Sequence, residues 1–255
     1  MILKWAQHLI YMIKKWFRFL GRIIILFVLA SILSVIVFRF LPIPITPLVI
    51  QRIIEQGIEN NRNIRFKKSW VPISKISQYM QLAVVCSEDQ KFLKHFGFDI
   101  DAIKKASIHN KKNKRTHGAS TISQQTAKNV FLLPTRSYIR KGLEVYFTFL
   151  IECLWSKERI LEVYLNVIEF GDGIYGVQAA STIFFHKDAG KLSTGEAALL
   201  AAVLPNPLKY KVDQPGKYLL KRKNWIIRQM SHWGYHLDLE SAEIENTSEE
   251  EPAEE

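Results

Sequence analysis

The feature that most constrains this chain is an uncharged apolar run close to its N-terminus. Residues 23–38 read IIILFVLASILSVIVF and lie between Arg22 and Arg39. As a helix this run spans roughly 24 Å at about 1.5 Å per residue, slightly less than the ~30 Å hydrocarbon core of a bilayer. Arginine side chains at both ends can extend toward the lipid headgroups, so that residues 17–41 serve as the full span. We therefore predict one transmembrane helix.

The charges around this helix predict its orientation in the membrane. Basic residues precede the apolar run, and the first acidic residue of the chain is Glu55. The positive-inside rule then places the N-terminus in the cytoplasm and everything after Pro42 outside it. A cleaved signal peptide is the alternative, but the run is long and the segment LPIPITP that follows has no small-x-small cleavage pattern. The prediction is an uncleaved anchor.

Composition divides the chain into five segments. Pro42, Pro44 and Pro47 end the apolar helix and predict a short stiff linker. At the other end, eight glutamates fall within the last 16 residues and no aromatic residue accompanies them, which predicts a disordered tail. The segments are a basic cytoplasmic segment (residues 1–22), a transmembrane helix (23–41), a linker with a membrane-proximal region (42–64), a folded domain (65–236) and an acidic tail (237–255).

The composition also excludes several classes of protein. With 48% hydrophobic residues the chain is not low-complexity, collagen-like or wholly disordered. Its two cysteines, Cys86 and Cys153, are too far apart for a disulfide framework or a cysteine-based zinc site, and they are predicted to be free, mostly buried thiols. Residues 1–239 carry a net charge of +19, which is common in nucleic-acid-binding proteins, but the predicted export across the membrane leaves anionic lipid as the available partner. Nucleic acid is therefore not a predicted partner.

The pattern between about residue 50 and residue 235 is helical. Apolar residues recur there at spacings of three and four, and no sustained alternation of the strand type occurs. We predict a mainly α-helical domain of roughly 180 residues, which is enough for one hydrophobic core.

The first segment with chemical content is residues 83–97. As a helix it places Asp89 in the middle of an apolar face, so this carboxylate needs a fixed partner or a polar cleft beside it. Glu88 lies at the edge of the same face, where partial shielding favours a general base. The alternative is an ordinary helix-edge glutamate. His95 is more typical of a hydrogen-bonding residue at a helix end than of a catalyst.

The second segment, residues 117–129, predicts the start of a helix. Thr121 and Gln124 have capping-box spacing, and such a start presents backbone N–H groups and hydroxyls to a phosphate or a sugar. Gln124 and Lys128 are one turn apart and face the same way. A plain capped helix is the alternative.

The third segment, residues 135–152, carries charges at every fourth position. Arg136, Arg140 and Glu144 follow one helical ribbon beside an apolar stripe. They form either a self-paired ladder on the surface, which contributes little stability, or a basic clamp for a di-anion.

The remaining segments predict packing. A helix starts near Ser156 and ends near Asn166, followed by a glycine-rich turn and a second helix. Ser193 and Glu196 have capping-box spacing at the start of a small-residue core helix that stops at Pro205.

In their order and spacing, these segments resemble one known family. E-D-x-x-F-x-x-H-x-G, G-A-S-T-I-S-Q-Q-x-x-K-N, R-K-x-x-E, I-L-E-x-Y-L-N and A-A-L-L-A-A-x-L-P-x-P are similar to the motif set of the family 51 peptidoglycan glycosyltransferases, especially their monofunctional members in Gram-negative bacteria. The resemblance covers roughly residues 65–230. Ala119 departs from it, because many relatives have glycine there. The Ser-x-x-Lys and Lys-Thr-Gly motifs of an attached penicillin-binding domain do not occur.

The resemblance implies a fold, a reaction and a location. The fold is helical and lysozyme-like, with a cleft between two lobes. The reaction polymerises lipid II into β-1,4-linked glycan with inversion and releases undecaprenyl pyrophosphate. The catalytic domain would be periplasmic, anchored in the bacterial inner membrane. Penicillin-binding and cell-division proteins are candidate partners beside lipid II, the growing glycan and membrane lipid.

The resemblance also implies roles for individual residues. Glu88 matches the general base and Glu144 the second essential carboxylate, while Lys128, Arg136 and Arg140 supply positive charge to the leaving pyrophosphate. Asp89 braces the first motif. The donor side and its supports comprise Ser120, Gln124, Gln125, Lys141 and Asn166. No cofactor is required; a divalent cation, Mg²⁺ or Mn²⁺, at the pyrophosphate is compatible with this chemistry, although no motif here would hold one.

Two other functions stay open at this point. A lysozyme-like hydrolase or lytic transglycosylase shares a glutamate in a helical cleft, but it has no use for a pyrophosphate clamp. A non-enzymatic, membrane-anchored wall-binding module explains the anchor and the basic charge but not the pair Glu88 and Glu144. Turnover of lipid II distinguishes a polymerase from both of these alternatives.

Overall fold

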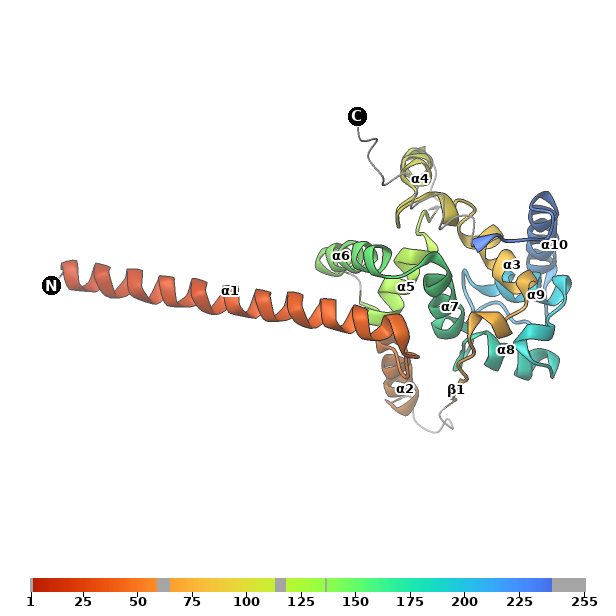
Figure 1. Ribbon diagram of the computed structural model, residues 1–255, viewed down its shortest axis with the longest axis horizontal. Coiled ribbons are helices and arrows are strands. Elements are labelled where there is room, and N and C mark those ends of the chain that lie inside the picture. Colours follow the sequence, from red (N-terminus) through yellow and green to blue (C-terminus); the bar gives the residue numbers. More distant parts are fainter. Residues whose placement is uncertain (1, 59–64, 113–117, 136, 240–255) are drawn as a thin grey trace, which may run out of the picture. The chain divides into compact units, whose positions relative to one another are not determined.

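The computed structural model describes residues 2–58, 65–112, 118–135 and 137–239 (Figure 1). Two compact units divide the chain, one from Met1 to Leu41 and one from Pro42 onward. The first unit is a single helix, α1, at Ile2–Phe40. Its stretch Tyr11–Phe40 is long and apolar enough to cross a bilayer, consistent with a single-pass membrane anchor. The helix begins well before the predicted start at residue 23.

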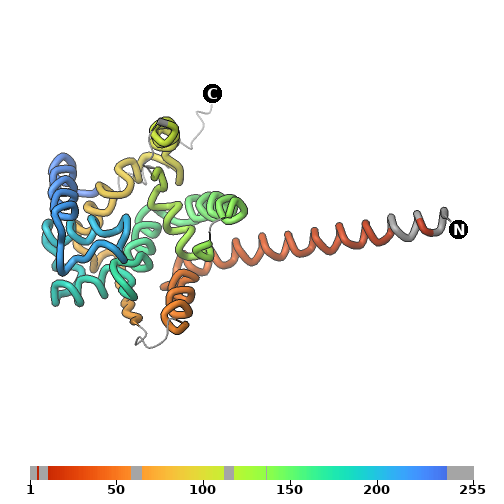
Figure 2. The backbone as a smooth tube through the Cα atoms, turned by 180° about the vertical axis from the view of Figure 1, so that it is seen from behind, coloured from red at the N-terminus to blue at the C-terminus, as the bar shows by residue number. Residues whose placement is uncertain are grey.

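The second unit is mainly α-helical, as predicted. Its described elements in chain order are α2 (Pro47–Ile58), β1 (Lys67–Lys68), η1 (Ile73–Lys75), α3 (Gln78–Glu88), η2 (Phe92–Lys94), α4 (Ile100–Lys112), α5 (Ile122–Phe131), α6 (Tyr138–Leu154), α7 (Lys157–Val167), β2 (Glu169–Gly171), β3 (Ile174–Tyr175), α8 (Val177–Phe185), η3 (Ala189–Lys191), α9 (Thr194–Val203) and α10 (Lys217–His232). Figure 2 follows the same path from behind.

Helix α9 forms the centre of one half of this unit. It packs against α3 and α10, while α5 packs against α6 and α7 (Figures 1 and 2). Residues from Ala197 to Leu204 are all buried, which confirms the predicted core helix. The predicted capping box of Ser193 and Glu196 is present at its start. The small side chains of α9 let α3 and α10 pack closely against it. Helices α3 and α10 carry residues of the site described below.

Pro47 does not extend the linker as predicted but starts helix α2. The ring fixes φ near the helical value, and the missing N–H is not needed at a first helical position. Thr46 Oγ1 accepts a hydrogen bond from Val49 N at 3.4 Å, which satisfies one of the free donors of the first turn. The predicted stiff linker is therefore confined to the residues between α1 and Thr46.

The predicted glycine-rich turn forms a small sheet. Strand β3 pairs in parallel with β1 and antiparallel with β2, in the order β1-β3-β2. Gly173 has a φ of +72°, and a Cβ there would lie 2.1 Å from the carbonyl oxygen of Arg65. Only glycine fits this turn, which joins the start of the domain to the segment after α7.

The structure corrects two further predictions. Helix α3 ends at Glu88 and does not run through residues 83–97, because Asp89 leaves the helical conformation at a φ of −160°. The Asp89 side chain instead bonds to groups outside the helix, as described below. Of the two cysteines, Cys86 is buried but Cys153 is exposed.

Candidate active site

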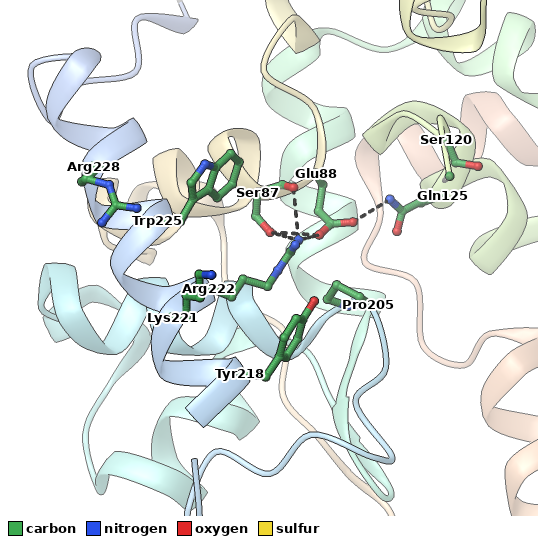
Figure 3. Close-up of a pocket in the computed structure, with 11 residues that line it drawn as sticks. Ser87, Glu88, Ser120, Gln125, Pro205, Tyr218, Lys221, Arg222, Trp225 and Arg228 are labelled. Atoms are coloured by element: carbon green, nitrogen blue, oxygen red, sulfur yellow. Dashed lines mark hydrogen bonds and ion pairs between the residues drawn. The ribbon is translucent and has the colours of Figure 1, made fainter. Parts of the chain in front are cut away.

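The two arms of one cleft meet at Glu88. Both arms are lined by Glu88, Ser120, Gln125 and Pro205. The larger, here called the α10 arm, has a volume of about 700 Å³ and adds residues of helix α10 (Figure 3). The smaller, here called the cationic arm, has a volume of about 350 Å³ and adds residues of α5 and α6.

Glu88 is held from both sides at the end of α3. Its Oε1 accepts hydrogen bonds from Ser87 Oγ at 3.0 Å and from Arg222 Nη2 at 3.4 Å. Its Oε2 accepts from Gln125 Nε2 at 3.2 Å (Figure 3). The side chain keeps 13% of its surface exposed, toward the junction of the two arms. A carboxylate has about four lone-pair sites, two on each oxygen, so one on Oε2 remains for a substrate proton.

Tyr164 orients the amide that contacts Glu88. The tyrosine hydroxyl donates to Gln125 Oε1 at 3.3 Å, which leaves Gln125 Nε2 to donate to Glu88. Burial, with the nearby Glu88 and Asp89 carboxylates, raises the pKa of Tyr164 well above its ordinary value, so that it stays a donor. Tyr164 thereby fixes which end of the Gln125 amide faces the carboxylate.

Asp89 is buried and has the fixed partners that its position in the sequence requires. Its carboxylate accepts from the backbone N–H of Ile122 at 3.0 Å and contacts His95 Nε2 at 2.9 Å. These bonds connect the end of α3 to the start of α5. Asp89 therefore fixes the positions of Glu88 and Gln125 relative to each other without lining either arm. His95 has the hydrogen-bonding role predicted for it.

The start of α5 has the predicted capping box. Thr121 Oγ1 accepts from Gln124 N at 3.1 Å, and Gln124 Oε1 accepts from Thr121 N at 3.0 Å. Asp89 takes the N–H of Ile122. The prediction that this helix start offers free N–H groups to an anion is therefore wrong for Ile122 and Gln124. Gln124 serves the cap and also lines the cationic arm, while its neighbour Gln125 faces Glu88.

Among the described residues, the cationic arm carries three positive side chains around Glu144, with Glu88 at its junction with the α10 arm. Glu144, buried at 4% exposure, pairs with Arg140 Nη1 at 2.9 Å and with Lys141 Nζ. Lys128 lines the same arm. Burial lowers the pKa of Lys128, the attraction of Glu144 opposes this, and the repulsion of Arg140 and Lys141 adds to it. The arm thus has excess positive charge and suits an anion.

Of the predicted site residues, Arg136 lies outside the described residues. Asn166 lines neither arm: its side chain exchanges hydrogen bonds with the backbone of Val71 at 2.9 Å in each direction and donates to Glu162 O at 2.8 Å. Asn166 thus attaches the chain before α3 to helix α7.

Sequence reasoning missed Arg222. This residue reaches from α10 to Ser87 Oγ at 3.0 Å and to Glu88 at 3.4 Å (Figure 3). A signal was present, because aromatic and basic residues recur along one face of the last helix. They are Tyr218, Lys221, Arg222, Trp225 and Arg228, at intervals of three, one, three and three residues.

Known proteins resemble this chain over most of its length. A family model described as Transglycosylase matches residues 56–231, a range that contains every lining residue of both arms. A biosynthetic peptidoglycan transglycosylase of Bacteroides thetaiotaomicron is 52% identical over 219 residues, which cover 86% of this chain and 88% of the relative. Proteins of the same name from Yersinia pseudotuberculosis (strain YPIII) and Yersinia pestis (strain Pestoides F) are each 54% identical over 202 residues, covering 79% of this chain and 84% of the relative.

Proposed function

This chain belongs to the transglycosylase family and is a peptidoglycan glycosyltransferase, and from that premise we propose that it polymerises lipid II with Glu88 as the general base. The observation that carries the proposal is the position of Glu88. Its carboxylate is held by hydrogen bonds at the point where the cationic arm meets the α10 arm. The test is a gel of labelled lipid II products, run with and without a glycan-digesting muramidase. Ladders that the muramidase removes support the proposal.

The proposed reaction begins with proton removal from the acceptor. The 4-hydroxyl of one sugar is a poor nucleophile until Glu88 accepts its proton. The hydroxyl oxygen then bonds to C1 of the lipid-linked muramyl residue as the bond from C1 to the phosphate oxygen breaks. Attack opposite the leaving group converts an α-linked donor into a β-linked product. Glu88 later returns its proton to solvent, and undecaprenyl pyrophosphate leaves.

In this proposal the cationic arm stabilises the leaving pyrophosphate. Lys128, Arg140 and Lys141 place positive charge where negative charge develops, which is the largest single contribution in many enzymes. Glu144 pairs with two of these cations and keeps them in place before the substrate arrives. Ser120 and Gln125, which line both arms, lie beside the reacting atoms.

The described residues of this arm offer a divalent cation few ligands. Its own carboxylate, Glu144, already pairs with two cationic side chains. No group of three or more His, Cys, Asp or Glu side chains in the described part of the chain is placed to hold a metal ion. We therefore derive no step through Mg²⁺ or Mn²⁺ and assign charge neutralisation to the three cations.

The alternative functions account for less of the site. A hydrolase or lytic transglycosylase acts on finished glycan, which has no pyrophosphate to occupy the cationic arm. A wall-binding module needs no carboxylate restrained by Ser87, Gln125 and Arg222. Both alternatives predict that lipid II remains unpolymerised in the gel assay.

We also propose that α1 anchors the enzyme in the bacterial inner membrane, with its N-terminus in the cytoplasm and the catalytic unit in the periplasm. The basic residues before the apolar stretch support this orientation. Lipid II and the growing glycan chain, both attached to polyprenyl lipid, are then confined to the same bilayer.

Removal of residues 1–41 is expected to leave a folded but slower enzyme. The remaining residues belong to a separate compact unit, so the melting temperature should change little. In vesicles that contain lipid II we expect the polymerisation rate to fall about tenfold or more, because the anchor raises the effective concentration of enzyme at its substrate. Equal rates for both proteins in vesicles would contradict this. In detergent with dispersed substrate the difference should shrink.

Substitution of Arg222 tests how Glu88 is positioned. Arg222→Ala removes the contacts to Ser87 and Glu88, and we expect kcat to fall roughly 10- to 100-fold with KM nearly unchanged, since small misplacement of a catalytic group is costly. Arg222→Lys keeps the charge within reach and should recover part of the rate. A kcat equal to that of the wild type in Arg222→Ala would show that Ser87 and Gln125 suffice.

A further inference from the structure

The α10 arm contains a wall that the proposed reaction does not use. Tyr218, Lys221, Trp225 and Arg228 project from successive turns of α10 toward the cavity (Figure 3). Tyr218 is 48% exposed and stacks on Tyr210 with ring centroids 5.1 Å apart, and Trp225 is 36% exposed. These aromatic faces are accessible and are held by the fold.

Two cations of this wall lack an anionic partner in the described part of the chain. Arg222 is occupied by Ser87 and Glu88. Lys221 and Arg228, by contrast, form no ion pair with any described residue, although both line the cavity. Glu88 is the one carboxylate among the lining residues, and Arg222 and Gln125 already contact it.

The wall therefore combines aromatic faces with cations available to a ligand. Exposed aromatic rings offer apolar faces on which a sugar ring can stack, and Arg and Lys side chains bind carboxylate and phosphate groups. A ligand that fits both parts is a sugar that carries an anionic group. A neutral glycan strand would leave the two cations unused.

The proposed pyrophosphate site lies elsewhere in the cleft. Lys128, Arg140 and Lys141 line the cationic arm, and the α10 arm extends from the same Glu88 but shares none of these three residues. The second set of cations, Lys221 and Arg228, suits a second anionic group on the substrate. Beyond its pyrophosphate, lipid II carries anionic charge in the carboxylates of the peptide on its muramyl sugar.

We propose that the α10 wall is a substrate subsite at which Trp225 and Tyr218 stack on sugar while Lys221 and Arg228 bind the carboxylates of the peptide on the muramyl residue. The proposal rests on the proposed function. It assigns to α10 the recognition of the peptide, and it leaves the chemical step to Glu88 and the cationic arm.

Binding measurements on the full chain in detergent test this subsite without turnover. The probes are a soluble muramyl disaccharide whose peptide has free carboxylates, the same compound with amidated carboxylates, and inorganic pyrophosphate. For Lys221→Gln/Arg228→Gln we expect about tenfold weaker binding of the free-carboxylate probe, and for the wild type a similar loss on amidation. Binding of pyrophosphate should not change in this variant.

A matched control removes two charges from the same region. Lys209→Gln/Lys217→Gln alters exposed lysines that do not line the cavity, and it should bind all three probes as the wild type does. For Trp225 we expect loss of sugar binding in Trp225→Leu and recovery in Trp225→Phe. In steady-state assays the Lys221 and Arg228 double variant should raise KM for lipid II with little change in kcat.

The outcomes separate this inference from the proposed function. Binding of the free-carboxylate probe that is equal in the wild type, the double variant and Trp225→Leu overturns the subsite, whatever the wild type does with lipid II. If the double variant instead loses binding of pyrophosphate, the anion site on α10 binds phosphate, and the proposed recognition of the peptide is overturned. Failure of the wild type to polymerise lipid II, with the binding results as expected, overturns the proposed function alone.

Discussion

Glu88→Gln is expected to abolish glycan polymerisation, with a fall in rate of roughly 10²- to 10⁴-fold or to background. The amide has the shape of the carboxylate but cannot accept the proton of the 4-hydroxyl, so the loss should fall on kcat and not on substrate binding. The measurement is lipid II turnover at matched protein concentration, together with binding of a phosphoglycolipid inhibitor of the moenomycin type, which we expect to be retained.

The surroundings of Glu88 explain why this variant should still fold. Its carbonyl oxygen can take the place of Oε1 and accept from Ser87 and Arg222. Its new N–H₂ group then faces Gln125 Nε2, so the Gln125 amide must turn over to accept, and the Tyr164 hydroxyl then accepts from Gln125 instead of donating to it. Substantial residual polymerisation would show that another group is the base, with Glu144 the first to examine.

Asp89→Asn provides the contrast. Asp89 is buried, accepts from the Ile122 N–H and contacts His95 Nε2, so an amide at this position turns an N–H₂ group toward one of these two partners and loses the acceptor there. We expect a loss of about 1–3 kcal/mol in the free energy of unfolding together with a lower rate. Glu88→Gln should instead lower the rate with little change in melting temperature, and thermal unfolding distinguishes the two variants.

Local patterns predicted much of the fold, because they depend on residues close together in the sequence. The capping boxes at Thr121 and Ser193 need only a side chain and a backbone group three residues apart, and both are present. The buried helix α9 follows from a run of small apolar residues. Helical periodicity singled out Glu88, Lys128 and Arg140, the family resemblance gave them roles, and the structure places all three around one cleft.

The errors arise where a distant residue competes with local structure. Asp89 ends α3 because its carboxylate bonds to Ile122, 33 residues away, a partner that helical periodicity does not reveal. The same bond occupies an N–H group that was predicted to be free for an anion. Arg222 approaches Glu88 from 134 residues further along the chain, so its role depends on the packing of α10 against α3.

The ladder of Arg140 and Glu144 shows how burial changes the meaning of a pattern. On an exposed helix such a pair contributes at most ~1 kcal/mol, and this was one of the two interpretations open from the sequence. Glu144 is in fact buried, and two cations surround it inside a cavity. The interpretation as a surface ladder is therefore wrong for Glu144.

Arg140→Ala is expected to lower the polymerisation rate by roughly 10²- to 10³-fold with little change in melting temperature. The rate falls because the variant removes positive charge from the position proposed for the leaving pyrophosphate. Stability should change little, because Lys141 still pairs with Glu144 and no buried charge is left without a partner. The measurements are lipid II turnover, binding of inorganic pyrophosphate and thermal unfolding.

The matched control is Arg159→Ala, which breaks a comparable helical ion pair away from the cleft. Arg159 pairs with Glu162 on α7 and lies over the Trp70 ring at 5.3 Å, but it lines neither arm. This variant should lower the melting temperature and leave the rate and pyrophosphate binding unchanged. If Arg140→Ala instead resembled Arg159→Ala, losing stability while keeping its rate within about tenfold of the wild type, Arg140 would act as a structural partner of Glu144. The proposed stabilisation of the leaving group would then depend on Lys128 and Lys141, since these are the other cations that line the arm.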